Sequence, residues 1–296
     1  GSPTIVAGVA NIVSDRPPVM MTEGQHESEV VDHFISNFKT GGNVLEKTEK
    51  KEKEAVATPD FPIKDMREGA KGVITWAEIT NGEVARPSLE ILTPARHLAD
   101  QLGDDTKIST ILIGKGVAHL ADTLFEHGTD EVILVEDDRL EEYLVLPFSD
   151  IIAQILKARH QEIALFAATT AGRELAPRIA VKTGSGVTAD CTGLEIGEYV
   201  NKKEKIIVKP ILFSRRPTYG DSKLATILGF VCPQISTARA GTFEVPATES
   251  GRKGVLSTFT PELNEKDFSV EILKTVRGDG GMQALRSEER RVGKEC

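Results

Sequence analysis

Two hydrophobic patterns alternate along the chain from residue 72 onward. Short, continuous apolar runs indicate buried strands, and the stretches between them carry apolar residues at helical spacing. The runs predict strands over Gly72–Glu78, Lys107–Gly114, Glu131–Glu136 and Glu162–Ala168, and the helical patterns cover Ser88–Leu102, Ala118–His127 and Phe148–Arg159. Strands that recur about every 25 to 35 residues with helices between them are typical of βαβ units. The predicted fold class is α/β, a mostly parallel open sheet with flanking helices.

One such unit lies over Ala164–Leu194 and its immediate surroundings. The apolar run Ile163–Ala168 is followed by a loop of small residues, a helical pattern, and a second strand over Val187–Thr192. Open α/β sheets bind their ligands at the carboxyl ends of such strands. We therefore expect the functional loops of the chain to lie at that edge of the sheet.

The pattern changes after Leu194, where strands follow one another with few helical stretches between them. The sequence predicts strands over Ile206–Ser214, Leu224–Cys232, Gln234–Ala238 and Phe268–Arg277. Antiparallel pairs added to the edge of a parallel sheet would produce this pattern, because mixed sheets are common.

The two ends of the chain differ from this central region. A strand is predicted at Thr4–Val9 and a helix at Glu27–Phe38, before the mixed-charge run Glu46–Glu54, which is typical of a linker. The tail Arg286–Cys296 is basic, poor in apolar residues and typical of translated read-through. The expected organisation is an extension and linker over residues 1–70, the main domain over 71–277, and a truncated tail over 278–296.

Composition narrows the functional class. The formal net charge of −9 argues against non-specific nucleic-acid binding, which requires a basic face. The three cysteines have no metal-ligand spacing, and we expect reduced thiols and no metal site. No apolar run approaches the roughly 20 residues that span a bilayer, and a signal peptide is absent from the first residues. These features predict a cytoplasmic protein that does not insert into membranes.

No catalytic constellation is present in the sequence. The chain lacks the GxSxG and GxxxxGK[ST] motifs, and none of its six histidines has the spacing of a metal site. Gly114-Lys115-Gly116 follows a predicted strand and is at best a fragment of a phosphate loop. We therefore predict no catalytic residues.

Two loops after strands carry richer chemistry. Thr169, Thr170 and Gly172 precede a helix whose first amides favour an anion, and Arg173 could add a bond to phosphate. A plain helix start with an exposed arginine is an equally good interpretation. In the second loop, Thr188, Asp190 and Thr192 could bond the hydroxyls of a ribose or ribityl group. Asp190 could equally cap a neighbouring helix or pair with Arg178.

Two arginine-containing turns follow later strands. Arg215-Arg-Pro-Thr-Tyr-Gly220 combines basic residues with one of the three tyrosines, and Arg239-Ala-Gly241 places an arginine beside a glycine turn. Such turns bind an anionic cofactor or contact a partner subunit, and the residues alone favour neither.

Four segments together resemble the α subunit of electron-transfer flavoproteins. They are Gly172-Arg-Glu-Leu-Ala-Pro-Arg178, Thr188-Ala-Asp-Cys-Thr-Gly-Leu194, Arg216-Pro-Thr-Tyr-Gly220 and Thr237-Ala-Arg-Ala-Gly241. The second is similar to the anaerobic, bacterial type, and the resemblance runs from about residue 72 to 277. Asp221 and Ser222 depart from the family pattern, which has a glycine and an asparagine there.

The resemblance implies an electron carrier rather than an enzyme. It implies a heterodimer with a β subunit, an N-terminal nucleotide-hydrolase-like α/β domain, and a C-terminal domain with most of the FAD contacts. The chain would then be a fragment without that second domain, serving chiefly to dock the β subunit, with a flavin dehydrogenase as the electron donor. The residues expected to face the cofactor are Arg173, Arg178, Thr188, Asp190, Arg216, Tyr219 and Arg239.

In this interpretation the arginines face phosphate or a reduced, anionic isoalloxazine, and Thr188 and Asp190 hold the loop or bond hydroxyls. Two alternatives come from other classes. One is a universal-stress-type module that binds AMP or ATP directly, and it requires a usable phosphate loop. The other is a structural interaction domain whose motifs serve a subunit interface.

Overall fold

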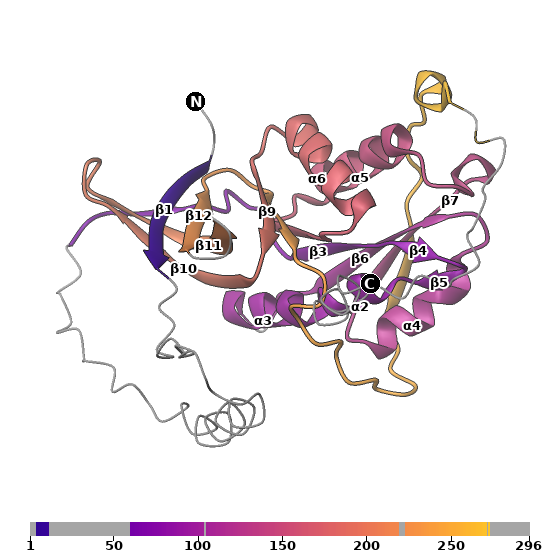
Figure 1. Ribbon diagram of the computed structural model, residues 1–296, viewed down its shortest axis with the longest axis horizontal. Coiled ribbons are helices and arrows are strands. Elements are labelled where there is room, and N and C mark those ends of the chain that lie inside the picture. Colours follow the sequence, from indigo (N-terminus) through magenta and orange to yellow (C-terminus); the bar gives the residue numbers. More distant parts are fainter. Residues whose placement is uncertain (1–3, 12–59, 104, 219–222, 271, 273–296) are drawn as a thin grey trace, which may run out of the picture.

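The computed structural model describes residues 4–11, 60–103, 105–218, 223–270 and 272. A parallel sheet with helices on both faces forms one part of the molecule, and an antiparallel sheet lies beside it (Figure 1). The predicted helix at 27–38 and the basic tail at 286–296 lie outside the described residues. The proposed division of the chain at residue 70 stays a prediction.

The parallel sheet has seven strands in the order β14-β7-β6-β3-β8-β13-β9. They are β3 (Val73–Ala77), β6 (Ile108–Gly114), β7 (Glu131–Glu136), β8 (Ile163–Ala167), β9 (Val187–Cys191), β13 (Gln234–Ala238) and β14 (Val255–Thr258). Every residue of β3, β6, β8 and β13 is buried. Continuous burial is expected where helices cover both faces of a parallel sheet, and the predicted α/β fold class is confirmed.

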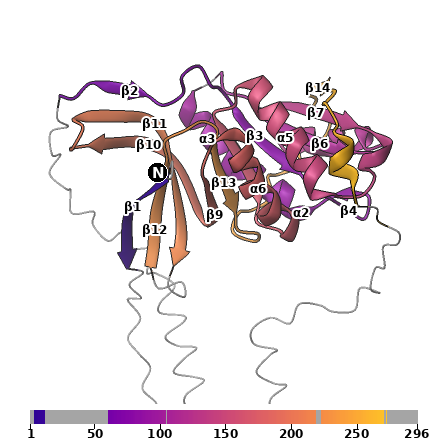
Figure 2. The same cartoon turned by 90° about the horizontal axis from the view of Figure 1, so that it is seen from above.

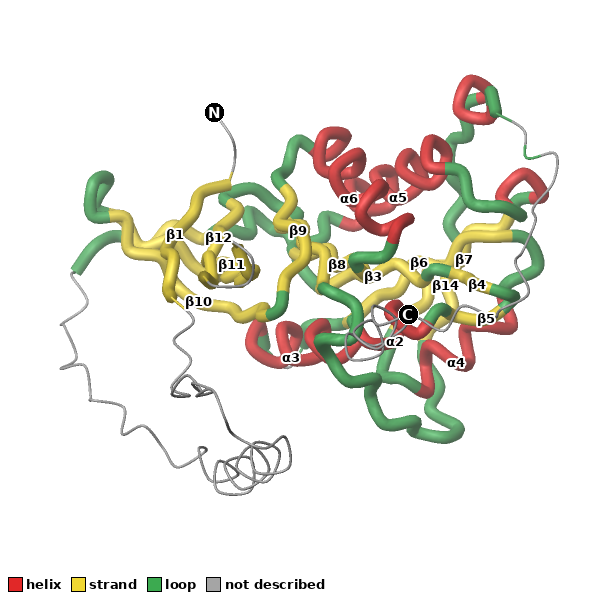
Figure 3. Tube along the Cα trace, viewed as in Figure 1, coloured by secondary structure: helices red, strands yellow, loops and turns green. Residues whose placement is uncertain are grey.

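Helices cover the parallel sheet on both sides (Figure 3). The α-helices are α2 (Arg86–Glu90), α3 (Leu92–Leu102), α4 (Ala121–Glu126), α5 (Val145–Arg159) and α6 (Thr170–Thr183), and the short 3₁₀ helices are η2 (Ala118–Leu120), η3 (Asp138–Leu140) and η4 (Glu265–Phe268). Leu175 and Ile179 of α6 pack with α5 on one face, and Leu98 of α3 packs on the other. These contacts build an aliphatic core on each side of the sheet.

The predicted helix Ser88–Leu102 is divided in two at Ile91. Pro94 lies in the first turn of α3 and has no backbone N–H to donate to the carbonyl of Glu90, so a continuous helix cannot form there. The predicted turn at Asn81-Gly82 joins β4 (Ile79–Thr80) to β5 (Glu83–Val84). Both turn residues have positive φ angles, 56° and 80°, as a two-residue hairpin turn requires.

Strand β13 was expected among the antiparallel strands, and this expectation is wrong. It lies inside the parallel sheet and pairs in parallel with β8 on one side and β9 on the other. The two strands of the predicted βαβ unit are therefore separated by a third strand that comes about 45 residues later in the chain. Full burial and hydrogen bonding on both sides place β13 here.

The antiparallel strands form a sheet of their own beside β9 (Figure 2). They are β1 (Thr4–Asn11), β12 (Lys223–Gly229), β11 (Ile206–Thr218) and β10 (Gly193–Asn201), and β2 (Ile63–Asp65) pairs in parallel with β11. The strands predicted near residues 4, 206 and 224 are thus confirmed, but they do not extend the edge of the parallel sheet. The chain passes from β9 into β10 at Thr192, whose N–H donates to the Arg215 carbonyl at 2.9 Å.

The strand predicted over Phe268–Arg277 is wrong for the residues that the structure describes. Phe268 ends the 3₁₀ helix η4, and the described positions after it, 269, 270 and 272, are not in a strand. Asn264 caps η4 by accepting a hydrogen bond from the Lys266 N–H at 3.1 Å, which favours a helical turn over an extended chain.

Glu162 lies at the amino end of β8, where the two sheets meet. Its side chain is 2% exposed, and its Oε1 atom has no hydrogen-bond partner among the described residues. Burial raises the pKa of this carboxyl to about 7; the nearby Arg67 guanidinium opposes the shift and the Asp65 carboxylate adds to it. The folded chain therefore favours the protonated carboxyl below about pH 7.

We predict that Glu162 makes the protein less stable as pH rises. Well below pH 4.5, the ordinary pKa of the group, the Glu162 carboxyl is protonated in both the folded and the unfolded chain. Above pH 4.5 it ionises in the unfolded chain first, so the free energy of unfolding falls as pH rises to about 7. Glu162→Gln should remove up to about 3 kcal/mol of this cost, of which about 1 kcal/mol appears between about pH 6 and pH 8. Urea unfolding at the two pH values measures it.

The exposed turn residue Glu204 supplies the control for this measurement, since Glu204→Gln should change stability equally at both pH values. A Glu162→Gln protein whose stability follows the parent at both pH values would contradict the assignment of a buried, proton-binding carboxyl.

Gly172 allows α6 to approach β8 closely. A Cβ atom at this position would lie 1.9 Å from the Ala167 carbonyl oxygen and 3.1 Å from its carbon. No rotamer relieves that contact, because both atoms belong to the backbone of the strand. The glycine in this loop is therefore required by packing between helix and strand.

Gly172→Ala should lower the free energy of unfolding by about 1–3 kcal/mol, because the clash outweighs the gain of about 1 kcal/mol in helix propensity. Gly193→Ala is the matched control, since its Cβ would meet only the Arg215 side chain, at 3.5 Å or more. Urea denaturation of the two variants compares them. Equal effects of the two substitutions would mean that close approach does not explain Gly172.

Candidate functional site

The carboxyl ends of β3, β8, β13 and β9 meet at one edge of the parallel sheet. The chain builds outward from β3 to β6 and β7 and then crosses to β8 on the other side of β3. Helices α3 and α4 follow the first strands, and α5 and α6 lie on the opposite face (Figure 1). The reversal places the topological switch point between β3 and β8, which is where open α/β sheets bind ligands.

Glu78 and Thr169 occupy this switch point. They follow β3 and β8, respectively, and the Thr169 hydroxyl donates a hydrogen bond to Glu78 Oε2 at 2.5 Å. The Glu78 N–H in turn donates to Ser88 Oγ at 2.9 Å, which ties the same loop to α2. The crevice between the two strands is thus bridged by a carboxylate and a hydroxyl from the chain itself.

Thr169 is also the N-cap of α6. Its Oγ1 accepts the Gly172 N–H at 3.1 Å, and its carbonyl accepts the Arg173 N–H at 3.0 Å. Two amides of the first turn are therefore satisfied within the chain, in the manner of an ordinary helix start. The amides of this loop are thus committed to the helix start, which leaves the Arg173 side chain as the group that can contact an anion.

Arg173 and Asp190 form an ion pair between α6 and β9. The Arg173 Nε atom lies 3.0 Å from Asp190 Oδ1. Asp190 has a positive φ of 56° in a bulge between β9 and β13, and its N–H donates to Thr237 Oγ1 at 2.9 Å. Arg178, the partner considered from the sequence, is exposed further along α6 and forms no ion pair with Asp190 in the described structure. The bulge turns the Asp190 side chain toward the start of α6.

Arg216 lies on β11, where this strand passes the end of β9. Its Nε atom is buried and has no hydrogen-bond partner among the described residues. The positive charge lies close enough to the fully buried Cys191 to oppose the rise in its thiol pKa, which burial nevertheless raises to about 12. An unsatisfied, buried guanidinium donor lowers the stability of the fold.

The other residues chosen from the sequence are distributed around this edge. Thr188 is 4% exposed inside β9, which limits the access of a ligand to its hydroxyl. Arg239 is exposed directly after β13, and its N–H donates to the Cys191 carbonyl at 2.9 Å. The structure therefore brings Arg173, Thr188, Asp190 and Arg239 to one edge, with Arg216 on the adjoining sheet. Tyr219 lies outside the described residues.

Several acidic and aromatic residues at this edge were missed in the sequence. Trp76, the single tryptophan of the chain, lies 6.2 Å from Tyr143 between ring centroids, and its Nε1 is buried without a partner in the described structure. The Tyr143 hydroxyl donates to Glu174 Oε2 at 3.4 Å; burial, reinforced by this carboxylate, raises the pKa of Tyr143. The sequence offered one signal for these side chains, namely that they lie at or after the carboxyl end of a predicted strand.

Glu90 fixes the turn that follows β13. Its side chain is 7% exposed; Oε2 accepts the Gly241 N–H at 2.6 Å, and Oε1 lies 3.1 Å from Arg86 Nε. The glycine turn after Arg239 is therefore held by a buried carboxylate from α2. This contact positions Arg239 through the backbone.

The fragment of a phosphate loop at Gly114-Lys115-Gly116 is satisfied by carboxylates. Lys115 Nζ lies 3.2 Å from Glu141 Oε2, and the N–H groups of Val117 and Ala118 donate to Glu136 Oε1 at 2.8 and 3.3 Å. A carboxylate thus accepts the hydrogen bonds that a phosphate would need from this loop.

No group of three or more histidine, cysteine, aspartate or glutamate side chains is placed to hold a metal ion within the described ranges. In the same part of the chain, no helix has the length and apolar character needed to cross a bilayer.

Comparison with known proteins identifies the family. The family model for the electron transfer flavoprotein domain matches residues 73–264. The α subunit of the electron transfer flavoprotein of Thermoanaerobacterium thermosaccharolyticum is 34% identical over 211 residues, which are 70% of this chain and 59% of the relative. Protein FixB of Clostridium saccharobutylicum is 33% identical over 211 residues, which are 70% and 58% of the two chains.

A third relative is subunit LctC of the lactate dehydrogenase (NAD(+),ferredoxin) of Acetobacterium woodii. It is 25% identical over 219 residues, or 74% of this chain and 50% of that subunit. The chain thus spans less than two thirds of the length of these relatives. The first of these relatives is named as a subunit of an electron transfer flavoprotein, the class of electron carrier that the resemblance implied. The matched residues begin at β3 and include the whole parallel sheet, and the chain belongs to the electron transfer flavoprotein family.

Proposed function

We propose that the chain acts in an electron-transfer flavoprotein α subunit as the part that docks a β subunit and lines one side of an FAD site. In the heterodimer, electrons pass from a flavin dehydrogenase through FAD to an acceptor. The observation that carries this proposal is the family match over residues 73–264, which covers all seven parallel strands and strands β10 to β12.

The names of the relatives support the heterodimer and the dehydrogenase partner. One is an α subunit, which implies a second kind of subunit, and another is a subunit of a lactate dehydrogenase that uses NAD(+) and ferredoxin. Because this chain spans 59% of the first of these relatives, the activity proposed for it is that of a contributing part.

The described residues fit part of an FAD site rather than all of it. The Arg216 side chain is half-buried beside the end of β9, and flavin and phosphate oxygens are acceptors that a guanidinium binds well. The switch point itself presents Glu78 and Glu174, which disfavour phosphate. Arg216 and Arg239 would hold and orient the cofactor from one side, and the flavin would supply the chemistry of electron uptake and release.

The alternative of a universal-stress-type AMP or ATP module receives no support from the geometry of the described residues. Its phosphate loop would have to be Gly114-Lys115-Gly116, where Glu136 and Glu141 already accept the available donors. A nucleotide would have to displace both carboxylates. The flavoprotein proposal requires no such rearrangement.

Arg216→Gln should weaken FAD retention in the heterodimer reconstituted with a β subunit of the family. Loss of one charge-assisted hydrogen bond predicts an affinity about tenfold lower. Gel filtration followed by a visible spectrum measures flavin per heterodimer. Arg159→Gln at the opposite end of the sheet, where Arg159 pairs with Glu131, is the control and should leave flavin retention unchanged. Equal retention by both variants would remove Arg216 from the cofactor site.

Arg173→Ala should also lower the FAD content of the heterodimer several-fold while the two subunits still assemble. The reason is the loss of a cation beside the cofactor edge, where Arg173 pairs with Asp190. Asp190→Asn is the matched variant, since it removes the ion pair and keeps the arginine, and it should retain FAD. Failure of the Arg173→Ala chain to assemble would assign Arg173 to the subunit interface instead of the flavin.

A further inference from the structure

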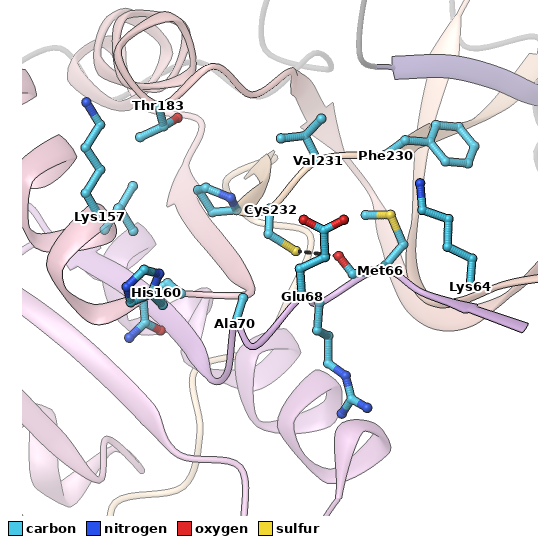
Figure 4. Close-up of a pocket in the computed structure, with 14 residues that line it drawn as sticks. Lys64, Met66, Glu68, Ala70, Lys157, His160, Thr183, Phe230, Val231 and Cys232 are labelled. Atoms are coloured by element: carbon cyan, nitrogen blue, oxygen red, sulfur yellow. Dashed lines mark hydrogen bonds between the residues drawn. The ribbon is translucent and has the colours of Figure 1, made fainter.

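A cavity of about 420 Å³ lies at the opposite edge of the parallel sheet from the candidate site (Figure 4). Three parts of the chain enclose it: the segment after β2, the carboxyl end of α5, and the loop between β12 and β13. Its volume falls within the range of small-molecule sites, roughly 300–1,000 Å³. Neither the family match nor the proposed flavin site accounts for it.

Apolar side chains form the inner wall of the cavity. Met66, Leu156 and Pro233 are buried, and Phe230 and Val231 continue the apolar surface toward the opening. Figure 4 shows Val231 above Cys232 and Phe230 further out, beyond Met66, and the Cys232 thiol donates to the Met66 carbonyl at 3.4 Å. This wall suits the apolar body of a ligand.

A buried polar group on the same wall lacks a partner. Gln161 lines the cavity, is 8% exposed, and its Oε1 accepts no hydrogen bond from the described residues. This oxygen has almost no accessible surface, so a ligand in the cavity does not bond it, and recognition rests on the apolar wall and on the charges at the opening.

The charges around the opening favour an anion. Lys64 and Lys157 line the cavity from β2 and α5, and neither forms an ion pair within the described structure. Arg67 is committed to Asp65 at 2.9 Å. Lys157 lies in the last turn of α5, where its charge stabilises the negative end of the helix dipole, and it also lowers the pKa of Asp150. Lys64 lies on a strand and has neither of these roles. Glu68 is the one carboxylate in the lining and opposes an anion.

From the apolar wall and the charges at the opening we propose that the cavity binds a small amphipathic organic anion. Its apolar body lies against Met66 and Leu156, and its anionic group is attracted by Lys64 and Lys157. The site is independent of the flavin and of the β subunit.

The probe for this site is 1-anilinonaphthalene-8-sulfonate, which combines an aromatic body with a sulfonate. Its fluorescence in a titration of the full chain should show saturation with one probe bound per chain. Val231→Trp fills the cavity from its rim and should weaken binding about tenfold or more. Val181→Trp is the matched control, since Val181 is 82% exposed on α6 outside the cavity, and it should leave binding unchanged.

Charge variants test the sign of the interaction. Lys64→Gln should weaken binding about threefold to tenfold, and Glu68→Gln should strengthen it. Circular dichroism and the thermal midpoint verify that each variant is folded. Equal probe affinity in Val231→Trp and Val181→Trp, or no response to either charge variant, would overturn the proposal.

Discussion

The pairing of β13 between β8 and β9 is the constraint on which the rest of the molecule depends. The chain leaves the parallel sheet after Cys191, builds the antiparallel sheet, and returns at Gln234. Its return joins the two sheets, because the Gln234 side chain accepts the Leu212 N–H at 2.7 Å and Ser236 bonds Ser214 at 2.8 Å. Removing β13 would separate β8 from β9 and leave these polar groups buried without partners.

The same strand determines the candidate site. Thr237 of β13 accepts the Asp190 N–H and holds the bulge that directs Asp190 to Arg173. Arg239 continues from β13, and Glu90 fixes the turn behind it. The edge is thus assembled from α2, α6, β9 and β13, elements that lie far apart in the sequence. The glycine and threonine residues of the motifs at this edge have structural roles, as the packing of Gly172 against Ala167 illustrates.

The hydrophobic pattern of a short segment was enough to predict the helices and strands whose burial depends mainly on their own residues. The apolar run Ile163–Ala167 predicted β8, because a strand that is buried on both faces needs continuous apolar residues, and the helical periodicity after it predicted α6. Strand β13 escaped prediction as a parallel strand because Gln234, Ser236 and Thr237 are polar yet buried. Their partners come from β11 and β9, so the cost of burial is offset by contacts that local sequence does not specify.

The candidate site, too, could be predicted only where it depends on local sequence. The TADCTGL segment marked Asp190, but the choice between Arg173 and Arg178 depended on a β-bulge formed with a strand about 45 residues away. Glu78 was missed because its importance arises only when β3 and β8 become neighbours and bring it to Thr169, 91 residues further along the chain. Arg216 was found from its family motif, and its lack of a hydrogen-bond acceptor emerges only from burial between the two sheets.

The most direct measurement is gel filtration of the purified chain with FAD, alone and with a β subunit of the family, followed by a visible spectrum of each peak. The account predicts that flavin elutes with protein only in the mixture, in a peak of heterodimer size. Flavin retained by the chain alone would contradict the view that its residues line only part of the site. Absence of both flavin and complex in the mixture would contradict its role in docking the β subunit.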